Sequence, residues 1–330
     1  MALGRFLLKR SLQGLLVVWG VITVVFLLRF VTPGSPIDAV APLDATQETR
    51  RAIAAELGLD QPLHIQYLTY LFDLIQGDMG FSYVRGVDVV GLVFLKVPAT
   101  VELAVAATVV AIVLSIPLGV ISATRRNQPI DYGATIFSLG GISTPNFWLG
   151  IMMILVLAVQ FDIFHTSGRG VTSFNVATSI LGPEPFFGTL IDWLSYITLP
   201  AISLGTYFMA LITRLTRSGM LDQLGRSYIR AARAKGLPET LVRYKHALRN
   251  TLVPVVTVLG LQLGTLIGGA VITEAVFSWP GLGTLVIQSI NLRDWPALQG
   301  SLIVIGTSFV IVNIAVDVIY AYLDPRVAYD

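Results

Sequence analysis

Residue patterns that support catalysis are nearly absent from this sequence. It contains no phosphate-binding G-x-x-x-x-G-K-[ST] loop, no metal-binding H-E-x-x-H pair and no G-x-S-x-G nucleophile elbow. The three histidines, His64, His165 and His246, are far apart along the chain, and the absence of cysteine excludes disulfides and thiolate metal sites. We therefore expect a chain that binds no cofactor or metal, hydrolyses no ATP and acts through binding.

The residues best suited to binding lie in one polar stretch, Arg214 to Thr251, between two apolar runs. It carries nine Arg and Lys residues against two acids, Asp222 and Glu239. Placing Arg or Lys at the bilayer centre costs about 2.5 to 3.5 kcal/mol each, so nine would cost on the order of 25 kcal/mol. The stretch is expected to stay in water on the cytoplasmic side, as an ordinary positively charged loop also would.

Within this stretch the residue types predict two short helices around a bend. Ser227 is expected to cap a helix over Tyr228 to Lys235, which Gly236 ends as a C-cap glycine does. Pro238 then suits the first turn of a second helix, and Glu239 suits its positive end. A compact helix-turn-helix of this kind against a membrane face is a docking surface.

The overall composition predicts a multi-spanning membrane protein. Of 330 residues, 54% are hydrophobic and only 13% are charged, and the mean hydropathy is +0.75, which does not describe a soluble enzyme. The net charge of +2 gives no indication of nucleic-acid binding. The apolar run from Leu12 to Val31 exceeds the roughly 7 to 15 residues of a signal-peptide core, so we expect a retained first span.

The section after this span, residues 32–98, is too polar to cross a membrane and is expected to form a small helical cap outside it. Asp44 or Thr46 is expected to cap a helix that stops at Gly58, and a second helix would run from Pro62 to Gly77. The apolar residues of this second helix, at helical spacing, are expected to be buried: Leu68, Leu71, Phe72 and Ile75. The cap would be either a packed connector or a surface that receives a substrate-delivering protein.

Five further spans are expected in residues 99–330, each long enough for the hydrocarbon core. They are Ala99–Ala123, Phe137–Phe161, Leu199–Ile212 with the flanking Ile197 and Thr213, Leu252–Thr273 and Leu302–Leu323. The fourth is short and interrupted by Ser203, Gly205 and Thr206, so other helices should cover it. Six spans return both ends to one side, and fifteen of the 22 basic residues then lie on the cytoplasmic side. The chain would thus divide into residues 1–31, 32–98 and 99–330, with the loop at 214–251.

Small residues and prolines mark the interior of the spans. Gly260, Gly264 and Gly268 recur every four residues, a stripe that lets helices approach closely or lines a pathway with exposed backbone. Pro145, preceded by Ser143 and Thr144, is expected to bend the third span.

Acidic residues in the spans are few. Asp317, with Asn313 one turn earlier, is either a functional intramembrane acid or the ion-pair partner of a basic loop residue. Glu102 and Glu274 are expected at the outer boundary, in water. The segment from Gly281 to Gly283 is expected to be a turn within a loop.

One short pattern in the polar stretch resembles the EAA loop of ABC importer permeases. It consists of Arg230-Ala231-Ala232 followed, after three further residues, by Gly236. In that family two small residues and a glycine form the coupling helix, although Arg230 stands where the general pattern has Glu. Residues Tyr228 to Thr257 are similar to the dipeptide, oligopeptide and nickel branch. Further stretches resemble its B-type permeases: Thr32–Pro36, with Ser35 in place of the usual Asp, Leu57–Ser82, Pro145–Gly150, Glu274–Gly300 and Leu323–Arg326.

The resemblance implies an all-α type I importer permease with six transmembrane helices, located in the plasma (inner) membrane with both termini cytoplasmic. A binding protein would deliver a peptide or similar solute, and a second homologous permease would complete the pathway. Two ATPase subunits, which bind ATP and Mg, would push on the coupling residues Arg230 to Leu237. Ala231, Ala232 and Gly236 would contact the ATPase, while Arg230, Arg233 and Lys235 would pair with it or with acidic lipid. Members of the family carry dipeptides, longer peptides, nickel complexes or sugars, and the solute stays open.

Two other classes of protein make different demands on the sequence. A secondary transporter or channel subunit that works without ATP needs polar or charged residues near the bilayer midplane. An intramembrane enzyme needs paired acids or a histidine cluster at that depth. The expected spans contain almost none of these residues, so the importer permease is the favoured interpretation.

Overall fold

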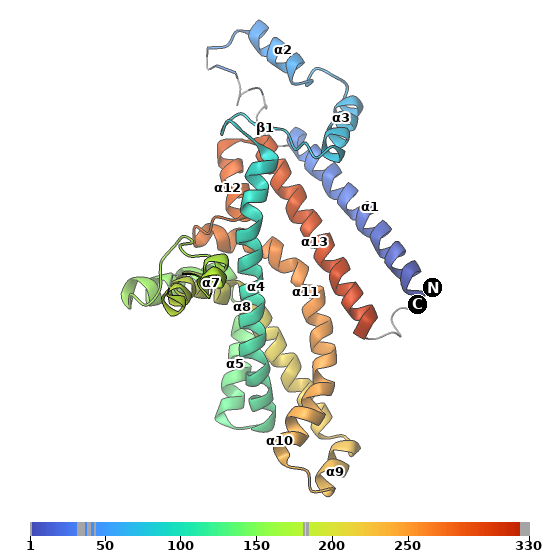
Figure 1. The fold of residues 1–330 in the computed structure, drawn as a ribbon, viewed down its shortest axis with the longest axis vertical. Coiled ribbons are helices and arrows are strands. Elements are labelled where there is room, and N and C mark those ends of the chain that lie inside the picture. The colour runs from blue at the N-terminus through green and yellow to red at the C-terminus, as the bar shows by residue number, and fades with distance from the viewer. Residues whose placement is uncertain are drawn as a thin grey trace. The chain divides into compact units, whose positions relative to one another are not determined.

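The computed structural model describes residues 2–31, 37, 41–42, 44–180, 182 and 185–323 (Figure 1). The described chain is almost entirely helical, as expected, and its strands form one antiparallel pair, β1 (Phe81–Ser82) with β2 (Val87–Asp88). It divides into two compact units: unit 1 is mainly residues 1–100 with 280–321, and unit 2 is mainly residues 101–279. The stretches Thr32–Pro36 and Asp324–Arg326, quoted for the family resemblance, lie outside the described residues.

Unit 1 contains the two ends of the chain. Its helices are α1 (Ala2–Val31), α2 (Gln47–Glu56), α3 (Leu63–Ile75), the start of α4 (Val89–Thr124), α12 (Leu282–Leu292) and α13 (Trp295–Leu323). Helices α1 and α13 pack at close range, because a Cβ on Gly14 would lie 2.8 Å from Ile314 Cδ1 and 2.9 Å from Val310 Cγ1. The amide of Gln299 also donates to the carbonyl of Val25 at 3.2 Å.

The segment from Gly281 to Gly283 was expected to be a turn within a loop, and this prediction was wrong. Gly281 instead precedes the apolar helix α12, whose Leu282 and Leu285 are buried against Val89 and Val93 of α4. The amide of Leu282 donates to Thr100 Oγ1 at 2.8 Å, so a side chain of α4 satisfies one of the free N–H groups of the first turn.

The predicted helices of the 32–98 section are present at nearly the expected bounds. Thr46, rather than Asp44, caps α2, and its hydroxyl accepts from the amide of Thr49 at 3.2 Å. Gly58 and Gly77 follow α2 and α3 with φ values of +64° and +84°, which favour glycine. The expected burial of α3 was wrong, because Leu68, Phe72 and Ile75 are 62%, 63% and 83% exposed.

Unit 2 is built from the rest of α4 and the helices of the middle of the chain. These are α5 (Pro129–Ser143), α6 (Asn146–Met153) with a π-helical extension Ile154–Gln160, α7 (Ser173–Ser179), α8 (Phe186–Leu224), α9 (Ser227–Ala234), α10 (Glu239–Leu241) with a π-helical extension Val242–Leu248, and α11 (Arg249–Val276). Helices α5, α6, α7 and α11 all contact α8, which is the centre of the unit.

Helix α8 is the most buried of the four long apolar helices, as the sequence predicted for the fourth span. In its apolar window 72% of residues are buried, against 17% to 28% in the other three long apolar helices. Gly205 explains part of this packing, since a Cβ there would lie 2.9 Å from the carbonyl oxygen of Ala107 in α4. The small residues that interrupt the apolar run are therefore where a neighbouring helix approaches the backbone.

The third expected span, Phe137–Phe161, is not one continuous helix. Thr144 adopts an extended conformation with ψ of 127°, and α5 and the α6 segment meet there at 112°. The residue before a proline is driven out of the α region by contact with the proline ring, so Pro145 sets the position of the break. The bend was expected, but its size was not.

Four described helices are long and apolar enough to cross a membrane: within α1, α4, α8 and α13. Two further pairs of helices, bent by 112° at Pro145 and by 43° near Pro254, bring the number to six if each pair is one span. The long apolar helices thus fall where the sequence predicted spans.

Candidate subunit-docking site

Helix α9 presents the predicted coupling residues at one end of unit 2. Arg226 occupies its N-cap position and makes no side-chain capping hydrogen bond, so the expected cap at Ser227 was wrong. Of the eight coupling residues, six are exposed, namely Arg230, Ala231, Arg233, Ala234, Lys235 and Gly236, and the other two, Ala232 and Leu237, are half-buried. The exposed residues form a small, cationic surface around the end of the helix.

Gly236 ends α9 as predicted. Its φ is +76°, its amide donates to the carbonyl of Arg233 at 2.9 Å, and the amide of Leu237 donates to the carbonyl of Ala232 at 3.3 Å. This pair of bonds is a Schellman motif, in which a left-handed residue satisfies the last carbonyls of a helix. A residue with a Cβ would be strained at this position, so glycine fixes the shape of the turn.

A small apolar cluster anchors α9 to the rest of unit 2. Ile229 is fully buried against Val120 and Ala123 of α4, Met220 of α8, and two residues of the α10 extension, Val242 and Ala247. Ala232 and Leu237 pack against the same cluster. Ala232 therefore belongs mainly to the packing beneath the helix, while Ala231 beside it stays free for a partner.

Tyr228 ties the start of α9 to the neighbouring segments. Its hydroxyl donates to Gln223 Oε1 at 2.7 Å and accepts from Asn250 Nδ2 at 2.9 Å. These bonds join the end of α8 to the start of α11 across the loop. The sequence analysis did not identify this role for Tyr228, or that of Ile229 as an anchor.

The bend after α9 is braced by charges. Arg233 donates to both carboxylate oxygens of Glu239, at 2.8 and 3.1 Å, and Arg243 donates to the same carboxylate at 3.1 Å. The hydrogen bond to Glu239 raises the pKa of the Arg233 guanidinium above its ordinary value. Arg233 was expected to face lipid or a partner but is engaged within the loop, whereas the structure gives no side-chain partner for Arg230 or Lys235 among the described residues.

A buried ion pair lies near this end of unit 2. Asp131, at the start of α5, accepts from Arg217 Nε at 2.5 Å, from Arg217 Nη2 at 2.9 Å and from Ser122 Oγ at 2.5 Å. The amide of Asn127 adds a fourth bond at 2.9 Å. Helices α4, α5 and α8 are thus joined through one carboxylate, to which the sequence analysis assigned no role.

The predicted glycine stripe of α11 is only partly buried. Gly260 and Gly264 are buried, but Gly268 is exposed and a Cβ there would meet no described atom within 4 Å. Close packing at Gly268 is therefore not found among the residues that the structure describes. The role of Gly260 and Gly264 as packing or pathway residues stays a prediction.

The expectation that Glu102 and Glu274 lie in water was wrong. Glu102 is 8% exposed and Glu274 is fully buried. Glu102 of α4 accepts from Arg169 Nε at 2.8 Å, from Trp193 Nε1 at 2.6 Å and from the amide of Ser173 at 2.7 Å. One carboxylate thereby holds the segment before α7 against α4 and α8.

Asp317 pairs with a basic residue, but not with one of the loop as the sequence analysis allowed. Its carboxylate lies 3.3 Å from Arg10 Nε of α1. Asn313 donates to the carbonyl of Phe309 in its own helix at 2.9 Å. The two side chains therefore have separate partners within unit 1.

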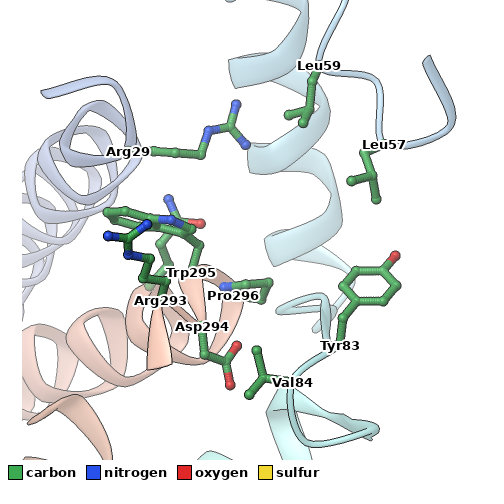
Figure 2. Close-up of a pocket in the computed structure, with 10 residues that line it drawn as sticks. Arg29, Leu57, Leu59, Tyr83, Val84, Arg293, Asp294, Trp295 and Pro296 are labelled. Carbon is green, nitrogen blue, oxygen red and sulfur yellow. The ribbon is translucent and has the colours of Figure 1, made fainter. Parts of the chain in front are cut away.

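Unit 1 contains a pocket at the corner between α12 and α13 (Figure 2). Arg29, Arg293 and Trp295 line it together with apolar residues that include Leu57, Leu59 and Val84. Asp294 at this corner is buried, caps α13, and pairs with Arg85 Nη1 and Ser82 Oγ, each at 2.6 Å. The buried pair fixes the β1–β2 hairpin to the corner.

The arrangement supports binding and mechanical linkage. Among the described residues no group of three or more His, Cys, Asp or Glu side chains is placed to hold a metal ion. Helix α9, in contrast, has an exposed face and packs on the ends of the long helices of unit 2.

Known proteins are similar to this chain along almost its whole length. Residues 115–329 match the family "Binding-protein-dependent transport system inner membrane component", and residues 3–104 match the N-terminal region of such membrane components. The chain is 38% identical to the oligopeptide transport system permease protein AppB of Bacillus subtilis, over 99% of this chain and 100% of that protein. It is 39% identical to the dipeptide transport system permease protein DppB of Escherichia coli K12, over 98% of both chains.

A third relative, the probable D,D-dipeptide transport system permease protein DdpB of Escherichia coli K12, is 40% identical over 97% of both chains. These relatives are permease subunits of transporters, and the apolar helices of this chain agree with a multi-pass membrane protein. The chain belongs to the family of binding-protein-dependent transport system inner membrane components, the permeases of ABC importers.

Proposed function

We propose that this permease forms half of a translocation pathway for di- or oligopeptides. The names of relatives that match it from end to end support this substrate class. A second, homologous permease would form the other half, and an extracytoplasmic binding protein would deliver the peptide. Two ATPase subunits would bind ATP and Mg, since this chain has no phosphate-binding loop.

In this proposal both termini and the loop 214–251 are cytoplasmic. The excess of Arg and Lys on that side supports the orientation, because positively charged loops are retained in the cytoplasm. The chain would be located in the plasma membrane, or the inner membrane of a cell with two membranes.

The observation that carries the proposal is the construction of α9. The exposed Ala231 and Gly236 would contact the ATPase, because small residues let a partner approach the helix backbone. Arg230 and Lys235 would pair with acidic groups of the ATPase or of lipid headgroups. Arg233 would instead keep the bend in shape through Glu239.

Movement of the ATPase would reach the spans through the packing beneath α9. Ile229 contacts the ends of α4 and α8, and Asp131 joins α4, α5 and α8. These helix ends would therefore move together when α9 is displaced. Differential binding of the ATPase to two arrangements of the helices would then switch the access of the pathway.

The proposal is tested with two substitutions of matched position and different size, Ala231→Trp and Ala231→Ser. Both leave the buried face of α9 unchanged. In proteoliposomes that contain the complete transporter, Ala231→Trp should abolish ATP-dependent uptake of labelled peptides and Ala231→Ser should retain it. Normal uptake with Ala231→Trp would contradict the docking role, whereas an Ala231→Ser transporter that takes up no peptide of any length would contradict the substrate class.

A further inference from the structure

Helix α3 has two apolar faces, and the described residues cover only one of them. On the covered face, Tyr67 packs edge-on against Phe26 of α1, with ring centroids 5.2 Å apart, and its hydroxyl lies 2.6 Å from Thr23 Oγ1. Gln66 Oε1 of α3 also accepts a hydrogen bond from Arg29 of α1. The second apolar face consists of Leu68, Phe72 and Ile75, which are more than 60% exposed.

The stripe of α1 that α3 covers continues as an exposed apolar stripe. Leu12, Leu15 and Trp19 are spaced at helical intervals with Thr23 and Phe26, and they are 61%, 70% and 53% exposed. Helix α13 packs on a different face of α1, through Gly14 and Val21. Helix α3 lies beside the C-terminal end of α1 (Figure 1), next to an apolar face that the described residues leave exposed.

The depth of the contact places α3 near the edge of the hydrocarbon core. The apolar span of α1 is 23 residues, Leu8–Phe30, which at about 1.5 Å per residue is close to the thickness of the core. Phe26 and Thr23 precede its end by four and seven residues, or about 6 and 10 Å. Amphipathic helices at membrane surfaces bury their apolar faces to about 5 to 10 Å.

We propose that α3 lies in the membrane–water interface at the C-terminal end of α1, with Leu68, Phe72 and Ile75 among the lipid acyl chains. The partner that fits this face is the lipid surface, because the face lies beside the exposed apolar stripe of a membrane-spanning helix at the required depth. A contiguous apolar face of this kind is costly in water. This assignment replaces the expectation that the whole section 32–98 forms a cap outside the membrane.

The absence of cysteine from the sequence makes a direct test possible. A nitroxide is attached at Phe72→Cys or Ile75→Cys, in the complete transporter in lipid nanodiscs with other subunits that lack reactive cysteine. Thr69→Cys, on the polar side of α3, and Glu48→Cys, on α2, are the matched controls. All four positions are exposed in the chain, so labelling leaves its packing intact.

The relaxation of each nitroxide is measured with oxygen, which concentrates in lipid, and with a water-soluble nickel chelate. At positions 72 and 75 we expect high accessibility to oxygen and loss of accessibility to the nickel chelate, relative to both controls. Equal nickel accessibility at positions 72 and 48 would place α3 in water and overturn the proposal. Exclusion of both reagents at positions 72 and 75 would also overturn it, because a protein partner would then cover this face.

Discussion

The guanidinium of Arg217 in α8 donates to both carboxylate oxygens of Asp131 in α5, with Nε 2.5 Å from Oδ1 and Nη2 2.9 Å from Oδ2. The carboxylate also accepts from Ser122 of α4, so three helices meet at one charged group. Helix α8 leads directly into the α9 loop. Arg217 therefore lies on the covalent route between the proposed ATPase contact and the span of α8, and Asp131 links α5 to it.

Replacing one member of this pair should destabilise unit 2. Loss of one partner from a buried ion pair costs about 3 to 5 kcal/mol, and the lower end is expected because the Arg217 side chain is 28% exposed. Asp131→Asn should lower the thermal unfolding temperature of the purified transporter. The double variant Asp131→Asn with Arg217→Gln should recover part of the loss, since no unpaired charge remains. If the loss in the double variant equals the sum of the losses in Asp131→Asn and Arg217→Gln alone, the two residues are not coupled.

Removal of the anchor beneath α9 should loosen the loop. Ile229→Ala leaves a cavity in the cluster and should cost about 2 to 5 kcal/mol locally, whereas Ile229→Val should cost about 0.5 to 1.5 kcal/mol. Hydrogen exchange of residues 227–237 reports the loss directly. Faster exchange is expected with Ile229→Ala and nearly normal exchange with Ile229→Val; identical protection in both variants would show that Ile229 is not the anchor.

The turn after α9 should depend on the conformation of Gly236 as well as on its size. With φ at +76°, Gly236→Ala places a Cβ in the left-handed region, at a cost of about 1 to 2 kcal/mol. Asn adopts this region more readily, so Gly236→Asn is the control. We expect peptide-stimulated ATPase activity to fall further with alanine than with asparagine. The reverse order would mean that side-chain bulk, rather than backbone conformation, limits this position.

Glu102 should hold the segment before α7 in place. In Glu102→Gln the charge is lost and Arg169 is left without its carboxylate, so residues 162–173 should become more accessible to added protease. Glu48→Gln changes an exposed carboxylate on α2 and should leave the cleavage rate unchanged. Unaltered cleavage in Glu102→Gln would contradict the holding role.

Features governed by local sequence were predicted well. The end of α9 at Gly236 follows from one glycine with a positive φ, and the break near Pro145 follows from the restriction that proline places on Thr144. The covering of α8 was predicted from Ser203, Gly205 and Thr206, because small and polar residues in a span indicate neighbouring helices. These signals act over a few residues, so a single sequence contains them.

Features that depend on distant residues were missed or wrong. Glu102 was expected in water because its partners, Arg169 and Trp193, are 67 and 91 positions away. The burial expected for α3 assumed that an apolar face must pack within the chain, although a membrane offers another environment for it. Periodicity identifies an apolar face, but it does not identify what covers that face.

Cross-linking from position 231 tests the central claim that α9 binds a separate ATPase subunit. Ala231→Cys provides a single reactive thiol in a chain without cysteine, and Glu48→Cys on α2 is the control. With a short thiol-to-amine cross-linker applied to the complete transporter in membranes, Ala231→Cys should be linked to the ATPase subunit, and Glu48→Cys should not. A transporter that forms and hydrolyses ATP but gives no link from position 231 to the ATPase, or gives one equally from position 48, would contradict this account.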